Sequence, residues 1–151
     1  MTSSALRTLV VVHGWLAWGA FLPLVGALVL FGSRRSIARG LLGGSMVCAV
    51  AAFVTGAWLH APFQSRLRQK LFLMSTALGW LFERKEHVAF GALALTGCAV
   101  FAAIGERIAR AEDEAVASSL ARAQKIAIVG VLVFEAFAIA VSYATSARVP
   151  L

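Results

Sequence analysis

The sequence predicts an all-α integral membrane protein, an up-down bundle of four transmembrane helices with an amphipathic interfacial helix between the second and third. Hydrophobic residues make up 60% of the 151 residues, and the mean hydropathy is +0.84. Soluble domains contain about 45–50% apolar residues. The apolar residues also gather in four long blocks, which a soluble core does not require. The length is that of a single domain spanning residues 1–151.

The first two blocks, at about residues 9–31 and 41–60, are each long enough for a helix to cross the ~30 Å hydrocarbon layer. The first block is longer than the apolar region of a signal peptide, and Arg34 and Arg35 follow it. It is therefore interpreted as a retained transmembrane helix. The second block is rich in Gly, Ala and Ser, which allow helices to pack closely in lipid. We expect Pro62 to break the second helix.

The segment from Ala61 to Glu86 predicts the interfacial helix. Apolar residues recur in it at spacings of three and four, and basic residues share the same segment. This pattern is typical of a helix that lies in the headgroup plane. The alternative is a loop that packs over the mouth of the bundle. The recurring apolar residues are Leu67, Leu71, Met74, Leu78 and Leu81.

The last two blocks cover about residues 88–104 and 126–143. The stretch between them, from Glu106 to Lys125, is polar, rich in Ala and of mixed charge. It predicts a helical hairpin arm in water rather than a disordered loop.

The net charge of +7 indicates a membrane surface rather than nucleic acid as the partner. Most basic residues lie between apolar blocks, where they can meet anionic lipid headgroups, and no aromatic-basic nucleic-acid motif is present. The 14 Lys and Arg residues divide evenly between the two expected sides. The short, acid-free first connector favours termini outside the cytoplasm of a bacterial inner membrane.

Four ionisable residues inside or beside the apolar blocks are the candidates for chemistry, because such residues are costly in a membrane. They are His13, His60, His87 and Glu135. In an up-down bundle the three histidines fall near one leaflet, with His60 ending the second helix and His87 starting the third.

Two imidazoles from facing helices are what axial haem ligation requires. We expect aromatic residues to line the macrocycle, although the tryptophans among them also fit an interfacial belt. The histidines could instead hold zinc or copper, or be structural. Cys48 and Cys98 form no CxxC or CxxCH pair, which excludes covalent haem attachment. The expected lining residues are Trp15, Trp18, Phe53, Trp58 and Phe90.

Glu135 lies in the apolar stretch VLVFEAFAIA. An isolated carboxyl group there must either take up a proton or pair with a cation, for which His13 is a candidate. A proton relay or a quinone contact is the functional interpretation. The structural alternative is a protonated glutamic acid that binds a backbone carbonyl or a partner subunit.

The stretch from His13 to Trp18, followed by Leu22 and Pro23, resembles the opening core helix of the transmembrane cytochrome b superfamily of ascorbate and ferric reductases. In that family four core helices each supply a histidine, and these bind two b-type haems. The resemblance makes His13, His60 and His87 candidate ligands. Since the fourth helix has no histidine, at most one haem fits. The layout is also similar to small bacterial four-helix membrane proteins of unassigned function.

These observations predict a small cytochrome-like membrane subunit that holds one haem b and passes electrons between a quinone and a partner. The second hypothesis is a cofactor-free accessory subunit of a larger membrane complex, and the third is a metal-handling or transport protein that uses the histidines and Glu135. Partner subunits or a homo-oligomer are expected. No hydrolase or transferase motif is present, so any activity is that of an electron-transfer subunit of an oxidoreductase.

Overall fold

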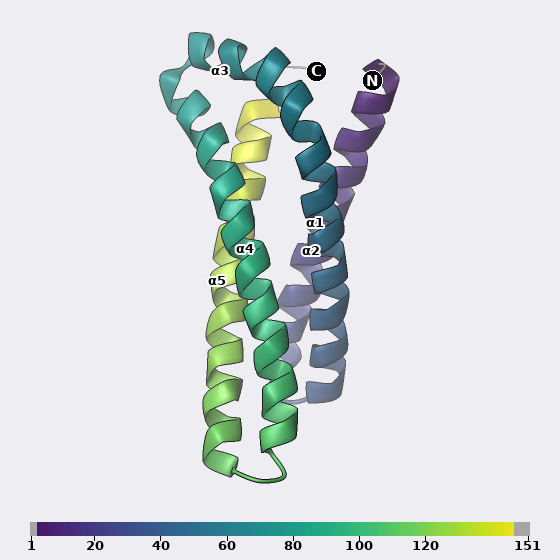
Figure 1. The fold of residues 1–151 in the computed structure, drawn as a ribbon, viewed down its shortest axis with the longest axis vertical. Helices are drawn as coiled ribbons and strands as arrows, with labels where there is room; N and C mark the ends of the chain where they lie inside the picture. Colours follow the sequence, from purple (N-terminus) through teal and green to yellow (C-terminus); the bar gives the residue numbers. More distant parts are fainter. Residues whose placement is uncertain (1–2, 147–151) are drawn as a thin grey trace.

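The computed structural model describes residues 3–146, which form only helices and short turns (Figure 1). Each of the four long helices is long and apolar enough to cross a membrane. The prediction of four apolar helices is confirmed, and the molecule is consistent with a membrane protein. These helices are α1 (Ser3–Leu30), α2 (Arg35–Phe63), α4 (Thr76–Ala109) and α5 (Glu114–Ser146).

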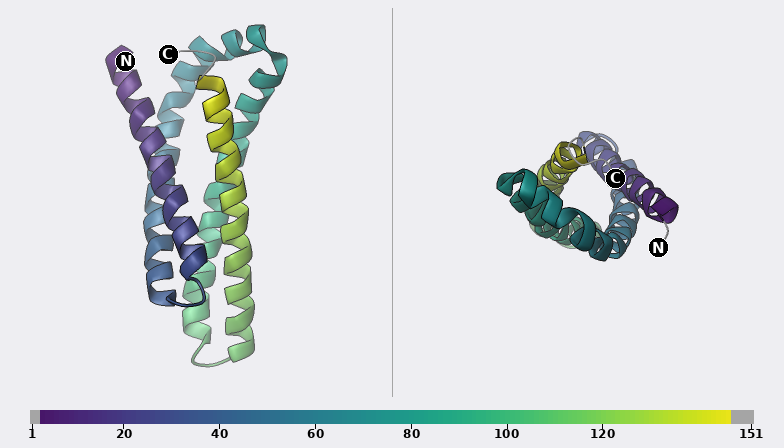
Figure 2. Two further views of the ribbon diagram at one scale, coloured as in Figure 1. Left: turned by 180° about the vertical axis from the view of Figure 1, so that it is seen from behind. Right: turned by 90° about the horizontal axis from the view of Figure 1, so that it is seen from above.

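Short turns join the long helices in two pairs. Residues 31–34 connect α1 to α2, and residues 110–113 connect α4 to α5. Helix α1 also packs on α5, and α2 on α4 (Figure 2). The start of α1 and the end of α5 lie at the same end of the molecule as α3 (Gln69–Met74), which lies above the end of α5 (Figure 1). At the opposite end, the 110–113 turn extends beyond the 31–34 turn (Figure 1).

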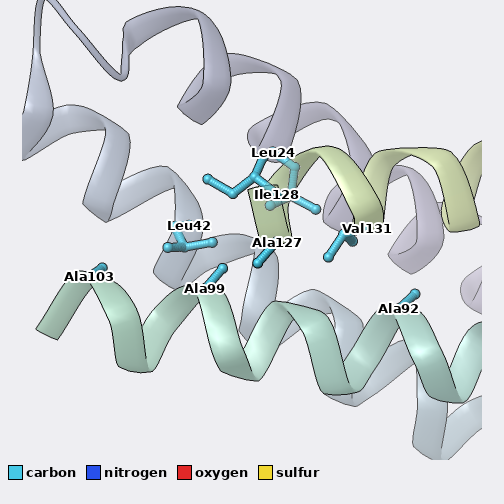
Figure 3. Close-up of a cluster of buried hydrophobic side chains, with 8 residues drawn as sticks. All are labelled: Leu24, Leu42, Ala92, Ala99, Ala103, Ala127, Ile128 and Val131. Atoms are coloured by element: carbon cyan, nitrogen blue, oxygen red, sulfur yellow. The ribbon is translucent and has the colours of Figure 1, made fainter. Parts of the chain in front are cut away.

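The core is built from small residues of α4 and larger residues of the other helices (Figure 3). Ala99 and Ile128 are fully buried within it. Small side chains let helices approach closely, which is how helices associate where lipid removes the hydrophobic driving force. The cluster comprises Leu24, Leu42, Ala92, Ala99, Ala103, Ala127, Ile128 and Val131.

Glycines allow the same close approach within each pair. A Cβ atom at Gly91 of α4 would lie 2.6 Å from Cε2 of Phe134 on α5. A Cβ atom at Gly19 of α1 would lie 3.2 Å from Sγ of Cys48 on α2. Cys48 therefore packs against α1 at a position where the partner helix has no side chain.

The segment after α2 differs from its prediction. Pro62 does not end α2, which continues to Phe63 and then into a π-helical turn, η1 (Gln64–Arg68). A local π-helical adjustment is one way in which a membrane helix accommodates proline. Helix α3 follows, and the helical conformation is interrupted at Ser75, whose backbone is extended.

Ser75 divides the predicted amphipathic helix in two. Its hydroxyl oxygen accepts a hydrogen bond from the amide of Leu78 (3.4 Å), which makes Ser75 the N-cap of α4. Leu78 and Leu81 therefore belong to α4. The early start of α4 also corrects the position of His87, which lies well inside this helix rather than at its beginning.

The polar stretch from Glu106 to Lys125 is helical apart from the turn, as predicted. The expectation that it is solvated is wrong for Glu106 and Gln124, each of which is only 2% exposed.

Candidate functional site

The three histidines lie on different helices in the half of the molecule that carries α3. His13 is on α1, His60 is near the end of α2, and His87 is in the first half of α4. Helix α2 links the first two, because His13 packs against Gly56, one turn before His60.

His13 is half-buried between α1 and α2. Its Nδ1 donates a hydrogen bond to the carbonyl oxygen of Ala52 (2.9 Å) and lies 3.2 Å from the hydroxyl oxygen of Thr55. The Thr55 hydroxyl group itself donates to the carbonyls of Ala51 and Ala52, so its oxygen can accept from His13. A Cβ atom at Gly56 would lie 3.1 Å from Cε1 of His13, so the glycine makes room for the ring.

His60 and His87 are more exposed than His13. Nδ1 of His60 donates to Oε1 of Glu86 on α4 (2.9 Å), and the histidine side chain is 51% exposed. Nδ1 of His87 donates to the carbonyl oxygen of Glu83, one turn earlier in the same helix (3.1 Å). The structure thus places His60 beside Glu86, the residue that precedes His87.

The three imidazoles share one hydrogen-bonding pattern. Carbonyl and carboxylate oxygens only accept, so the proton of each neutral ring lies on Nδ1 and the lone pair on Nε2. A histidine that ligates a metal through Nε2 is oriented by such a bond from Nδ1. In all three rings Nε2 is therefore the nitrogen that carries the lone pair.

The described part of the chain contains no group of three His, Cys, Asp or Glu residues that could hold a metal ion. The predicted aromatic lining is wrong for Trp15, Trp58 and Phe90, whose side chains are exposed. The exposure of the two tryptophans is compatible with the alternative, an interfacial belt. Phe53 and Phe90 do meet, edge to face, with ring centroids 4.7 Å apart between α2 and α4.

Glu135 is half-buried on α5. Its Oε2 atom is buried and has no hydrogen-bond partner among the described residues. The predicted pairing with His13 does not occur, because the hydrogen bonds of His13 go to α2. Glu135 thus presents an unpartnered carboxyl oxygen to the interior.

Sequence reasoning missed a second cluster at the opposite end. Glu106 is buried and forms ion pairs with Arg35 and Arg39 of α2. It also pairs with Arg110, which follows Glu106 by one helical turn. The signal available was the i, i+4 spacing of Arg35 with Arg39 and of Glu106 with Arg110. A carboxylate in the polar stretch between two apolar blocks is expected to be exposed, so nothing in the sequence indicated that Glu106 is buried.

Lys85 of α4 is a further polar residue in the half of the molecule that carries the histidines. Its Nζ donates to the hydroxyl oxygen of Ser142 on α5 (3.1 Å) and lies 5.2 Å from the centre of the Phe82 ring. The hydrogen bond to Ser142 joins α4 to α5 near His87.

Comparison of the chain with protein-family models gave no match, and no curated protein and no solved structure matched it.

Proposed function

We propose that the protein is a small membrane cytochrome-like subunit that binds one b-type haem through two of His13, His60 and His87 and serves quinone-linked electron transfer. The main support for this proposal is that the Nδ1 atom of each imidazole donates to an oxygen acceptor, which leaves Nε2 as the ligand atom. In the proposed topology the helices alternate in direction across a bacterial inner membrane, with both termini outside the cytoplasm and the segment around α3 in the headgroup layer.

The protein's own contribution is orientation and exclusion of water. Ala52 and Thr55 fix the ring plane and tautomer of His13, and Glu86 and the Glu83 carbonyl do the same for His60 and His87. The apolar helices provide a medium of low dielectric constant. A bound b-type haem would supply one-electron redox chemistry.

Glu135 is proposed as a proton relay or quinone contact. Quinone reduction consumes protons as well as electrons, and an unpartnered carboxyl oxygen within an apolar helix can exchange a proton with a bound quinone. A Glu135→Gln variant should retain any haem spectrum and slow quinone reduction.

The direct test is an absorption spectrum of the detergent-purified protein after haem-replete expression, oxidised and then reduced with dithionite. A shifted Soret peak and a sharp α-band on reduction are expected. Ala variants of the three histidines should then divide into two that lose the spectrum and one that retains it, which serves as the matched control. A featureless visible spectrum overturns the proposal.

The second candidate function is a cofactor-free accessory subunit of a larger membrane complex. The exposure of the His60 and His87 side chains favours this second function. A buried imidazole needs a ligand or a hydrogen-bond partner in place of water, whereas an exposed imidazole does not. Purification with partner proteins in fixed ratio, without haem or metal, would support this function.

A further inference from the structure

The Glu106 cluster carries more positive charge than its carboxylate neutralises. Three guanidinium groups, from Arg35, Arg39 and Arg110, surround one carboxylate. Their side chains are between 30% and 49% exposed, whereas that of Glu106 is 3% exposed. The arginine side chains, which carry the excess positive charge, are thus partly exposed around the buried carboxylate of Glu106.

A small cavity adjoins the cluster, and it contains unsatisfied hydrogen-bonding groups. It is lined by Phe31, Arg35, Ala38, Arg39, Glu106 and Gln124. The Nε atom of Arg39 and the Oε1 atom of Gln124 are buried without a hydrogen-bond partner. An unmade hydrogen bond in a buried site is costly, so each of these groups requires a partner, which a water molecule or a ligand can supply.

The unsatisfied groups suit an acceptor-rich anion. The Arg39 Nε–H can only donate. The Gln124 amide can turn by 180°, which exchanges its oxygen for its NH₂ group and presents a second donor. A phosphate group offers several acceptor oxygens and negative charge, and arginine forks match its geometry.

The start of α2 adds to this preference. Arg34, the N-cap residue of α2, makes no side-chain capping hydrogen bond. The first N–H groups of the helix therefore add partial positive charge at this end of α2, although the amide of Ala38, which lines the cavity, donates to the carbonyl oxygen of Arg34 (3.0 Å). The cavity also lies where α2 begins and α4 approaches its end, close to the expected level of lipid headgroups.

We propose that this cavity, defined by Arg35, Arg39 and Gln124 beside Glu106, is a binding site for the phosphate group of an anionic phospholipid. Glu106 holds the guanidinium groups in place, and the lipid phosphate completes the hydrogen bonds of Arg39 and Gln124. The site is independent of the histidines at the other end.

Native mass spectrometry of the full chain released from detergent micelles tests the proposal, with phosphatidylglycerol, phosphatidylcholine and inorganic phosphate each titrated separately. We expect bound phosphatidylglycerol at low micromolar concentration and at least tenfold weaker binding of phosphatidylcholine. The Arg39→Gln variant should weaken phosphatidylglycerol binding by about tenfold, which is typical of losing a hydrogen bond to a charged group.

Two further variants make the outcome decisive. Gln124→Met keeps the volume and every ion pair of Glu106, so it tests the site even where Arg39→Gln fails to fold, and it too should weaken binding. Arg107→Gln removes one exposed positive charge next to Glu106 and should leave binding unchanged. Equal weakening by Arg107→Gln, or no lipid preference at all, overturns the proposal. Competition by inorganic phosphate at similar concentration would assign the site to free phosphate and overturn the lipid assignment.

Discussion

The two ends of the molecule arrange their charges in opposite ways. At the end that carries α3, each acidic residue has one partner: Glu83 forms an ion pair with Arg68 (2.7 Å), and Glu86 accepts a hydrogen bond from His60 (2.9 Å). At the other end, one buried carboxylate, Glu106, holds three arginines.

The difference shows that an ion pair can serve two purposes in one bundle. An exposed pair contributes little to stability, because water and salt screen it. A buried carboxylate instead depends on its partners, since an uncompensated charge in a medium of low dielectric constant is strongly destabilising. The end that carries Glu106 is therefore under the stronger structural constraint.

The largest expected effect follows from removing the buried charge. Glu106→Gln leaves three guanidinium groups facing one another without a counter-charge, and we expect the free energy of unfolding to fall by about 3 kcal/mol. Chemical unfolding in detergent, followed by circular dichroism, measures this change. The control is Glu112→Gln, which removes an exposed acid in the neighbouring turn and should change little. Equal stability of the two variants would show that Glu106 is not an anchor.

An intermediate effect is expected where His13 meets α2. Gly56→Leu places atoms against the imidazole ring, whose Cε1 lies 3.1 Å from the position of a Cβ. Overpacking of this kind costs about 1–3 kcal/mol, and displacement of the ring should also shift any haem spectrum.

Gly43→Leu is the matched control for that variant. It adds the same side chain to the same helix where nothing lies within 4 Å of the new Cβ. Thermal unfolding and absorption spectra of both variants make the comparison. A spectrum unchanged in Gly56→Leu would argue against His13 as a ligand.

The smallest effect is expected at the exposed pairs. Glu83→Gln removes the partner of Arg68, whose side chain is 53% exposed, and should lower the unfolding free energy by less than about 0.5 kcal/mol. Raising the salt concentration should erase even this difference, because the pair is screened. A loss comparable to that of Glu106→Gln would remove the contrast between the two ends.

The sequence predicted the four long helices because each contains an uninterrupted apolar block, and block length is a strong signal for a membrane span. It predicted the helix ends less well. Pro62 did not end α2, since the following π-helical turn accommodates it, and Ser75 was not recognised as the N-cap of α4. Both errors concern local hydrogen bonds, which hydropathy does not report.

The candidate site was predicted in part. The position of the histidines in one half of the molecule follows from the order of the helices alone. Their individual partners, such as Ala52 for His13 and Glu86 for His60, depend on helix rotation and could not be read from the sequence. The burial of Glu106 was missed for the same reason, because two of its three arginines come from a helix 67 and 71 residues earlier in the chain.

The unequal reach of the two helix pairs has a consequence for how the protein is approached from outside. Helix α4 has 34 residues and α1 has 28, so their lengths are about 51 Å and 42 Å. Because Glu106 clamps α4 to the start of α2, the excess length cannot slide back into the bundle. The 110–113 turn therefore projects beyond the 31–34 turn. A soluble protein that docks at this end would contact a stepped surface rather than a flat one.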